Sequence, residues 1–435
     1  MRLRCQDLIQ SIHSGAYDRT LSGLYALDGQ ASSLDRAKDR AFRVIRGLQS
    51  VFSPSPGASV QLFSGPGRTE LGGNHTDHQH GRVLCASVDL DMLCCAVPNG
   101  LRTVRIHSEG YPELEISLDD LSPKPQEENT SAALVRGVAA KIAALGHPLS
   151  GFDAYAHSTV LSSSGLSSSA AYEVLLGNIF SRFSCGGTLD PISIAKIGQY
   201  AENVYFGKPC GLMDQMGSSV GGAVAIDFAD PSAPAVERID YDFSRSGHAL
   251  CIVDTGSCHA DLTDDYAAIP REMGEAAAYF GKAVLREVPE DQFRAALPAL
   301  RRACGDRAVL RSLHFYADDR RAAQEAAALR AGDFAGRFLE LVNASGLSSS
   351  LLLQNAWSAA DPRQQAVPMA LALGSELLDG AGAIRVHGGG FAGTIQAFVP
   401  LDRLERFRSG MEALLGPGMC HVLHIRAQGG CTVAP

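Results

Sequence analysis

The side chains of this chain that could do chemistry lie in four short segments. Residues 65–81 hold Arg68, two acids and three histidines among five glycines. Residues 161–170 form a serine-glycine run, residues 385–394 are glycine-rich, and residues 202–215 carry an acid on either side of a Gly/Pro loop. Phosphoryl transfer is catalysed mainly by positioning and by stabilising charge, and it uses these kinds of groups. Together the four segments predict that chemistry.

The polar segment 65–81 is predicted to be a loop that binds a ligand. Val60–Phe63 before it and Val83–Val97 after it have the apolar patterns of strands. Buried polar side chains need partners or water, so the segment is not expected in the core. Loops held between strands commonly carry binding residues.

The histidines of this loop also allow a metal site. The possible ligands are His75, Asp77, His78 and His80. Zinc uses such side chains in tetrahedral sites. Neighbouring ligands in one loop are geometrically awkward, however, and no H-E-x-x-H pattern or distant Cys/His set completes the group. Metal binding is therefore the less favoured interpretation.

Residues 161–170 are predicted to bind phosphate. The strand pattern of 152–160 enters this serine-glycine run, and the apolar helix pattern of 171–180 leaves it. Backbone N–H groups can converge on an anion there, because the residues are small and the helix begins with partial positive charge. A flexible linker or a helix cap would use the same residues, and the Walker sequence G-x-x-x-x-G-K-[ST] is absent.

The glycine-rich run 385–394 gives a weaker signal of the same kind. Four glycines in six residues follow a strand pattern, and they would let the backbone approach a ligand phosphate closely. A tight turn between two strands is the alternative, and for this run taken by itself it is the more common one.

Two acids flank a Gly/Pro loop that follows a helix predicted over 193–205. Glu202 could be a ligand of Mg²⁺, which prefers carboxylate and hydroxyl oxygens. Asp214 could act as a base or orient a nucleophile, with its pKa tuned by an arginine. Ordinary pairing of both acids with lysines is the alternative that holds in most proteins.

Composition places the chain among ordinary globular proteins. It is 46% hydrophobic and 20% charged, with a formal net charge of −9 at pH 7. An acidic balance without a Lys/Arg-rich run argues against a nucleic-acid-binding surface. The chain shows no signal-peptide pattern, no apolar run of about 18 residues and no C-x-x-C spacing among its cysteines. A reduced, cytoplasmic protein without a membrane partner is expected.

The patterns along the chain predict two domains. Helices are expected over 1–50 and 270–345, and several strands over 60–118. A change of composition near 230–247 marks the expected boundary. The predicted domains are residues 1–235 and residues 236–435.

Several motifs, in order along residues 40–435, resemble those of the GHMP small-molecule kinases and specifically the galactokinase branch. The matching segments are Gly65-Pro-Gly-Arg68 with Gly73-Asn-His75-Thr-Asp77, Gly165-Leu-Ser-Ser-Ser-Ala170, Pro209-Cys-Gly-Leu-Met-Asp-Gln215 and Gly388-Gly-Gly-Phe-Ala-Gly393. They are similar to the patterns P-G-R-V-N-L-I-G-E-H-T-D-Y, P-x-x-x-G-L-S-S-S-A, P-C-G-I-M-D-Q and G-x-G-F-G-G. One motif would be a weak signal, but the ordered set is specific.

The resemblance implies an α/β (α+β) protein with the two-domain GHMP kinase fold: a mixed sheet with helices in the N-terminal half and a ferredoxin-like C-terminal domain. ATP and the sugar would meet between the domains. The implied reaction is ATP-dependent phosphorylation of the anomeric hydroxyl of galactose or a close derivative, with ATP and Mg²⁺ as cofactors. A monomer or weak homo-oligomer is expected. A catalytically silent sugar sensor is the alternative from another class.

The resemblance also implies roles for the matched residues. Asp214 would accept or orient the proton of the sugar hydroxyl, and Arg68 would hold Asp214 ionised. The implied sugar-binding residues are Arg68, Asn74, His75, Asp77, Gly211, Asp214 and Tyr266. The implied ATP-binding residues are Ser163, Ser164, Gly165, Leu166, Ser167, Ser168, Ser169, Gly389 and Gly390. The implied magnesium-linked residues are Ser169 and Glu202.

Three departures from the signature bear on the substrate. Glu70 stands where the signature has asparagine, Asn74 where it has glutamate, and His78 where it has tyrosine. The signature's glutamate resembles a contact to the C6 side of the sugar, so its loss removes an obstacle to an anionic C6. The run Asp77-His-Gln79 also resembles the D-H-Q of galacturonate kinases. Galacturonate is therefore an alternative substrate.

Overall fold

The computed structural model describes residues 3–25, 31–161, 165–208, 210–257 and 262–434. The larger of its two sheets has eight strands: β1 (Gln61–Gly72), β2 (Arg82–Pro98), β3 (Thr103–Ser108), β4 (Leu114–Ser117), β5 (Phe152–Ser158), β6 (Ala223–Asp227), β7 (Ala235–Ile239) and β12 (Cys431–Ala434). Their order is β12-β1-β2-β5-β3-β4, with β6 paired to β2 and β7 to β6. Because β3 pairs with β5 in parallel and the other pairs are antiparallel, the sheet is mixed, as predicted.

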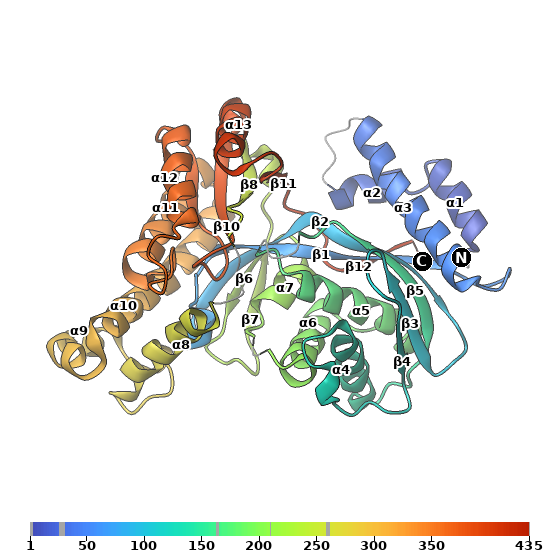
Figure 1. Ribbon diagram of the computed structural model, residues 1–435, viewed down its shortest axis with the longest axis horizontal. Coiled ribbons are helices and arrows are strands. Elements are labelled where there is room, and N and C mark those ends of the chain that lie inside the picture. Colours follow the sequence, from blue (N-terminus) through green and yellow to red (C-terminus); the bar gives the residue numbers. More distant parts are fainter. Residues whose placement is uncertain (1–2, 26–30, 162–164, 209, 258–261, 435) are drawn as a thin grey trace.

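Helices cover both faces of this sheet (Figure 1). On one face lie α1 (Cys5–His13), α2 (Asp18–Tyr25) and α3 (Ala31–Phe52). On the other lie α4 (Ser131–Ala144), α5 (Ser168–Ser184), α6 (Pro191–Ala201) and α7 (Met213–Val220). Along β2, Leu93 and Cys95 pack toward α1–α3, whereas Cys94 and Ala96 pack toward α4 and α5. The alternation of side chains along a strand therefore buries β2 on both faces.

A buried carboxylate, Asp91 on β2, joins the helical layer to the sheet. It accepts hydrogen bonds from Arg40 of α3 (2.7 Å), from the Tyr25 hydroxyl (3.1 Å) and from Ser64 of β1. Arg426, which precedes β12, also lies 3.4 Å away. Burial alone would raise the pKa of Asp91, but the two arginines hold it below its ordinary value. Asp91 is thus an ionised carboxylate whose partners come from the N-terminal helices and from the segment before β12, and its contacts hold both against the sheet.

The smaller sheet has four antiparallel strands in the order β11-β8-β10-β9: β8 (His248–Asp254), β9 (Ala383–Val386), β10 (Thr394–Pro400) and β11 (Cys420–Leu423). α12 (Ala366–Leu378) precedes β9, and α13 (Leu404–Leu415) lies between β10 and β11. Both helices pack on one hydrophobic cluster of this sheet. The path β-α-β-β-α-β with this strand order is ferredoxin-like, as predicted.

Further helices lie between β8 and α12 and form one end of the molecule (Figure 1). They are α8 (Thr263–Ala278), α9 (Glu290–Ala295), α10 (Leu297–Arg330) and α11 (Leu339–Ser348). The short helical turns of the chain are η1 (Asp77–Gln79), η2 (Pro125–Glu127), η3 (Glu202–Phe206), η4 (Phe243–Arg245), η5 (Leu285–Glu287), η6 (Phe334–Phe338), η7 (Ser349–Leu353) and η8 (Leu401–Arg403). This region confirms the helical prediction for 270–345.

The segment 65–81 differs from its prediction as a surface loop. Residues 65–72 are the last eight residues of β1 and are buried throughout. Only the part after Gly72, which includes η1, connects β1 to β2. These residues can be buried because the polar side chains of β1 find partners far away in the chain, such as Arg385 for Glu70. A buried charge is acceptable when it is paired and hydrogen-bonded.

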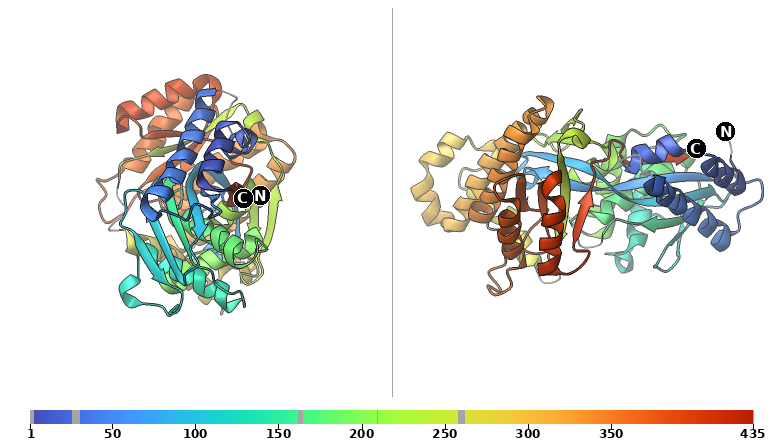
Figure 2. Two further views of the ribbon diagram at one scale, coloured as in Figure 1. Left: turned by 90° about the vertical axis from the view of Figure 1, so that its right-hand side faces the viewer. Right: turned by 90° about the horizontal axis from the view of Figure 1, so that it is seen from above.

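The predicted domain boundary between residues 235 and 236 stays a prediction. Strands from both sides of this boundary pair within the larger sheet. β7 begins at Ala235 and belongs to the larger sheet. β12, close to the end of the chain, pairs with β1 through Leu62 and Ala434. As a result α1 and β12 lie at the same end of the molecule (Figure 2).

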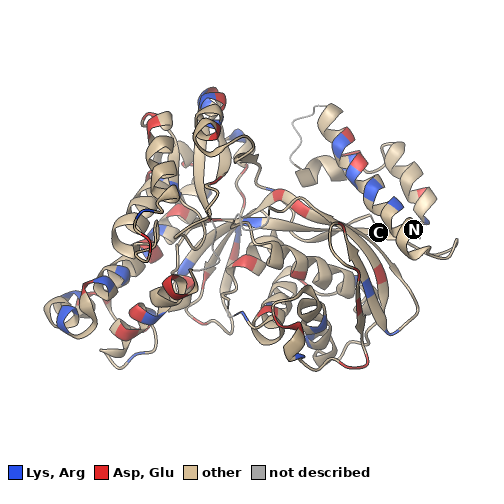
Figure 3. Ribbon diagram, viewed as in Figure 1, with Lys and Arg blue, Asp and Glu red and all other residues tan. Residues whose placement is uncertain are grey.

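Acidic and basic residues are interspersed along the helices of both halves (Figure 3). This mixture agrees with the modest net charge of −9. Among the described residues, no helix combines the length and the apolar character that crossing a membrane requires.

Candidate active site

Arg68 and Asp214 meet although they are 146 residues apart in the chain. Arg68 lies on β1, just after a break in the β1–β2 register, and its Nε donates to Asp214 Oδ1 at 2.7 Å. Its other nitrogens reach the same carboxylate oxygen at 2.6 Å and the carbonyl of Gly165. Ser167 donates to Asp214 Oδ2 at 2.7 Å. The predicted catalytic pair is therefore assembled, together with a serine of the predicted phosphate loop.

The position of Asp214 favours its charged form. It lies in the first turn of α7, where the N-terminal end of the helix stabilises a negative charge. Burial acts to raise its pKa, but Arg68 and then the Ser167 hydrogen bond lower it below the ordinary value. Asp214 is thus an ionised carboxylate that can accept or orient a proton near neutral pH.

The two predicted phosphate loops lie against each other. A side-chain carbon added at Gly388 would lie 3.8 Å from the Gly165 Cα. α5 begins at Ser168, so its first N–H groups lack partners within the helix. Ser163 and Ser164 lie outside the described residues. The loop from the larger sheet therefore faces the loop from the smaller one, as a nucleotide shared between the two sheets would require.

The glycine loop Gly388–Gly390 has its carbonyl groups bound and its N–H groups open. Its three successive carbonyl oxygens accept from Asn74 (2.8 Å), His75 (2.9 Å) and the Tyr266 hydroxyl (2.8 Å). Within the described part of the chain, the three N–H groups donate to no protein group. Open, convergent N–H groups are what an anion-binding loop provides.

Ser169 and Glu202 also come together. The Ser169 hydroxyl donates to Glu202 Oε1 at 3.1 Å, and Lys208 Nζ lies 3.5 Å from the same oxygen. Gln215 Nε2 bridges Glu202 (2.8 Å) and the buried Glu173 (2.9 Å). A hydroxyl and a carboxylate beside the phosphate loop form a donor set of the type Mg²⁺ prefers, because it takes few protein ligands and keeps several waters.

Two of the residues predicted to bind sugar, Gly211 and Asp77, lie side by side: a side-chain carbon added at Gly211 would collide with the Asp77 carboxylate. The His75 ring is engaged by Gly389, and Tyr266 by Gly390. Burial, reinforced by His78, lowers the pKa of His75 to about 4, so its ring is neutral at pH 7. The assignment of these four residues to a sugar stays a prediction.

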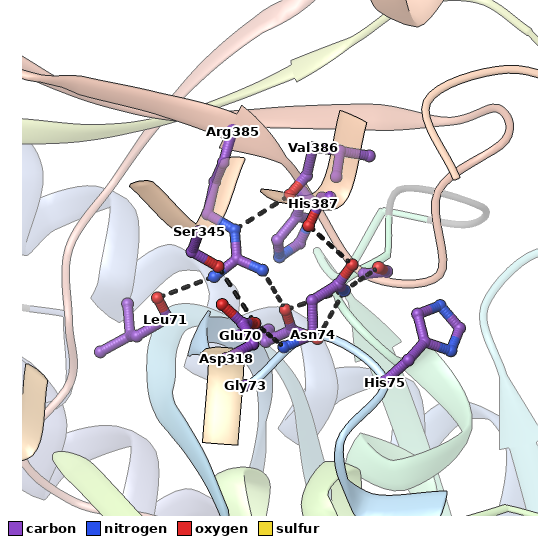
Figure 4. Close-up of polar contacts among 12 residues, drawn as sticks. Glu70, Leu71, Gly73, Asn74, His75, Asp318, Ser345, Arg385, Val386 and His387 are labelled. Carbon is purple, nitrogen blue, oxygen red and sulfur yellow. Dashed lines mark hydrogen bonds and ion pairs between the residues drawn. The ribbon is translucent and has the colours of Figure 1, made fainter. Parts of the chain in front are cut away.

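The contacts of Asn74 lie within the protein. Its side chain is 0% exposed, and Figure 4 shows it inside a polar network with Glu70, Asp318 and Arg385. Its Nδ2 donates to Glu70 (3.0 Å) and to the Gly388 carbonyl (2.8 Å). All hydrogen-bonding groups of this amide are engaged inside the protein, which weighs against Asn74 as a direct sugar ligand, and its role in sugar binding stays a prediction. Glu70 and Asn74, two of the three residues that depart from the signature, are therefore hydrogen-bond partners.

Two sequence interpretations change. The side chain of Gln79 in the D-H-Q run is buried and accepts from Leu285 N at 2.9 Å, which is a structural contact. The described residues contain no group of three or more His, Cys, Asp or Glu placed to hold a metal ion. Within the histidine loop, Asp77 Oδ1 instead accepts from the backbone of His78 at 2.9 Å.

Sequence reasoning missed Asn355, Gln215 and Arg385. Asn355 donates to Asn74 Oδ1 (2.9 Å) and to the Gly389 carbonyl (3.1 Å). No pattern marks it, because it follows an ordinary helical stretch. Gln215 is part of a matched motif and could have been noticed there. Arg385 lies three residues before Gly388, and its signal in the sequence was a charge within a strand pattern.

Glu325 on α10 is a buried acid with no partner for either oxygen among the described residues. Burial, then Asp318, raises its pKa to about 8, although Arg385 and Arg321 oppose the shift. The folded protein therefore keeps this proton to a higher pH than the unfolded chain does, and the stability it contributes is lost as pH rises toward 8.

Replacing Glu325 with glutamine is expected to flatten the pH dependence of stability. Between pH 5 and pH 8 the wild type should lose roughly 1.4 kcal/mol per pH unit relative to the variant. Urea unfolding at pH 6 and pH 8 measures this difference. Glu340→Gln, at an exposed site that pairs with Arg337, is the control. A gap between wild type and Glu325→Gln that stays constant with pH would contradict the assignment.

The fold and the site define a small-molecule kinase of the GHMP class. Residues 133–222 match the GHMP kinases N terminal domain, and residues 49–98 match the galactokinase galactose-binding signature. A galactokinase of Streptomyces coelicolor is 31% identical over 355 residues, which cover 81% of this chain and 87% of the relative. The chain therefore belongs to the galactokinase branch of the GHMP kinases, a branch of sugar kinases.

Solved structures share the fold. The crystal structure of Lactococcus lactis galactokinase complexed with galactose superposes with a TM-score of 0.74 at 24% identity, covering 88% of this chain and 97% of that one. The crystal structure of L. major mevalonate kinase in complex with R-mevalonate superposes with a TM-score of 0.59 at 14% identity, covering 86% of this chain and 99% of that one. The prediction of the two-domain GHMP fold is confirmed.

Proposed function

We propose that the protein transfers the γ-phosphoryl group of ATP to the anomeric hydroxyl of galactose or a close derivative. The observation that carries the proposal is the contact of Arg68 with both Asp214 and Gly165. It places an ionised acid directly beside the predicted phosphate loops. The family membership and the galactose bound to the Lactococcus relative support the choice of sugar.

The roles of the side chains follow from their contacts. Asp214, held ionised, accepts or orients the proton of the attacking hydroxyl. Arg68 holds Asp214 in place and stabilises the negative charge on the transferring group. The open N–H groups of the glycine loop and of the α5 N-terminus would receive phosphate oxygens. Ser169 and Glu202 would hold Mg²⁺, which supplies charge neutralisation when bound.

A neutral hexose is recognised by directional hydrogen bonds. His75, Asp77, the Gly211 backbone and Tyr266 would provide them. A site built to bond hydroxyl groups rejects analogues that leave its buried groups unpaired, each at about 1–3 kcal/mol. His75 suits this role because its ring is neutral at pH 7.

Galacturonate remains the alternative substrate, and one observation weighs against it. Asn74 did replace the signature's glutamate, but a carboxylate remains in the cluster at Glu70, where Arg385 pairs with it. The amide of Asn74 is already hydrogen-bonded within the protein, and it carries no positive charge that could pair with a C6 carboxylate. Because glutamate and asparagine have exchanged places between positions 70 and 74, the cluster still has one carboxylate to balance the charge of Arg385.

We expect galactose to be phosphorylated at C1 with a kcat/KM at least about tenfold above that of galacturonate, which corresponds to about 1.4 kcal/mol of transition-state binding. A coupled ADP-release assay over a sugar panel, with NMR of the product, measures both the preference and the position. Exclusive turnover of galacturonate would replace the proposal with the alternative. Binding of ATP and galactose without ADP release would assign the silent sensor instead.

A further inference from the structure

Every polar atom of Asn74 is bonded inside the protein. Its backbone N donates to Asp318 Oδ2 at 2.8 Å, and His314 Nε2 lies 2.9 Å from its carbonyl oxygen, which accepts. Its side-chain oxygen accepts from Asn355 (2.9 Å) and Ser349 (3.2 Å). With the two bonds of Nδ2 already described, this single residue joins β1, α10, the turn η7 and the glycine loop.

Glu70 and Arg385 provide the charges beside this junction. Glu70 is 4% exposed and Arg385 is 1% exposed, and the two form an ion pair (Figure 4). Arg385 also donates to the Leu71 carbonyl at 2.9 Å and to the Val386 carbonyl at 3.2 Å. The strand that leads into the glycine loop is thereby fastened to the strand that carries the catalytic arginine.

The junction is close to the reacting groups without touching their expected positions. Glu70 follows Arg68 by two residues on β1, so both side chains leave the strand on the same face. Gly388, held by Asn74, lies against Gly165 of the other phosphate loop. A shift of Asn74 would therefore move one phosphate loop relative to the other and to Arg68.

We infer that Asn74, supported by Glu70 and Arg385, is a positioning residue that anchors the carbonyl side of the Gly388–Gly390 loop and so presents its N–H groups to the phosphates of the nucleotide. This inference rests on the proposed function. It assigns to Asn74 a role in nucleotide placement, where the position in the signature suggested a sugar contact.

The variant Asn74→Asp tests the role without changing the size of the side chain. It removes the donor to the Gly388 carbonyl and places a second carboxylate beside Glu70. We expect the Kd of a non-hydrolysable ATP analogue, measured by calorimetry without sugar, to rise about tenfold. The KM for galactose should stay within about twofold, because no sugar contact is lost. The melting temperature should fall.

A second variant separates anchoring from stability. In Glu70→Gln/Asn74→Asp the amide and the carboxylate exchange places, so one negative charge again faces Arg385. The melting temperature should recover, but the nucleotide Kd should stay raised because the Gly388 carbonyl still lacks its donor. Asn343→Asp is the matched control, since Asn343 ties backbone at the other end of β9, at Gly382 and Ile384. It should leave the nucleotide Kd unchanged.

The outcomes that oppose the inference differ from those that oppose the proposed function. An Asn74→Asp variant that raises the galactose KM and keeps the nucleotide Kd would overturn the inference and support Asn74 as a sugar ligand. Full recovery of the nucleotide Kd in the double variant would mean that Asn74 matters only for the balance of charge. That result would also overturn the inference. A wild-type protein that binds no ATP analogue would overturn the proposed function, and the inference with it.

Discussion

Replacing Asp214 with asparagine is expected to lower kcat by about 10²–10⁴-fold, the usual contribution of a positioned proton acceptor. The amide still fits between Arg68 and Ser167, but it cannot take a proton, and Arg68 loses its ionic partner. Nucleotide affinity should change little, because the asparagine oxygen can still accept the hydrogen bond from Ser167 of the phosphate loop. Steady-state kinetics with galactose and direct titration with an ATP analogue measure the two effects.

The control for Asp214 is Asp230→Asn, since Asp230 is an exposed acid whose contacts are with its own turn. It should keep full activity. An Asp214→Asn enzyme with wild-type kcat would show that proton acceptance at this position is not needed. A loss of nucleotide binding equal to the loss of kcat would instead indicate a collapsed site.

Replacing Asp91 with alanine is expected to destabilise the fold by about 3–5 kcal/mol, because it leaves buried arginine charge without its partner. Arg426 and the Asp91 side chain are both 0% exposed, and Arg40 is 18% exposed. The contribution of Asp91 is present above the ordinary carboxyl pKa and should disappear as pH falls below about 4, because its pKa is lowered in the folded protein. Urea unfolding at neutral and acid pH measures both statements.

Asp89→Ala is the matched control, two residues earlier in the same strand. Asp89 pairs with His424, which is 52% exposed. Exposed pairs contribute about 0–1 kcal/mol, so this change should be mild. Equal losses of unfolding free energy in the two variants would contradict the conclusion that the buried ion pairs of Asp91 stabilise the fold.

The sequence allowed the fold class and the catalytic candidates to be predicted, because motif spacing carries that information. Arg68, Asp214, Ser169 and Glu202 each lie in a matched segment, and the structure brings them together in pairs. The contacts of Glu70 could not be predicted. A charge in a run of glycines looks solvated until its partner, 315 residues away, is placed beside it.

The hydrogen-bond partners of the predicted sugar-binding residues could not be predicted from the sequence either. His75 and Tyr266 match positions that suggest contact with a ligand, yet one polar atom of each, His75 Nε2 and the Tyr266 hydroxyl, bonds the glycine loop. A motif states which residue types are required, but it does not state which of several acceptors within reach each one takes. That choice depends on how two sheets, built from distant parts of the chain, meet.

The pairing of β12 with β1 has a consequence for synthesis of the protein. β1 is made long before β12, yet β12 covers the free edge of β1. Until β12 is made, β1 exposes a row of unpaired backbone groups of the kind that promotes association between chains. The larger sheet therefore stays incomplete at this edge until β12 is made, and a nascent chain stalled before residue 431 should need a chaperone to stay unaggregated.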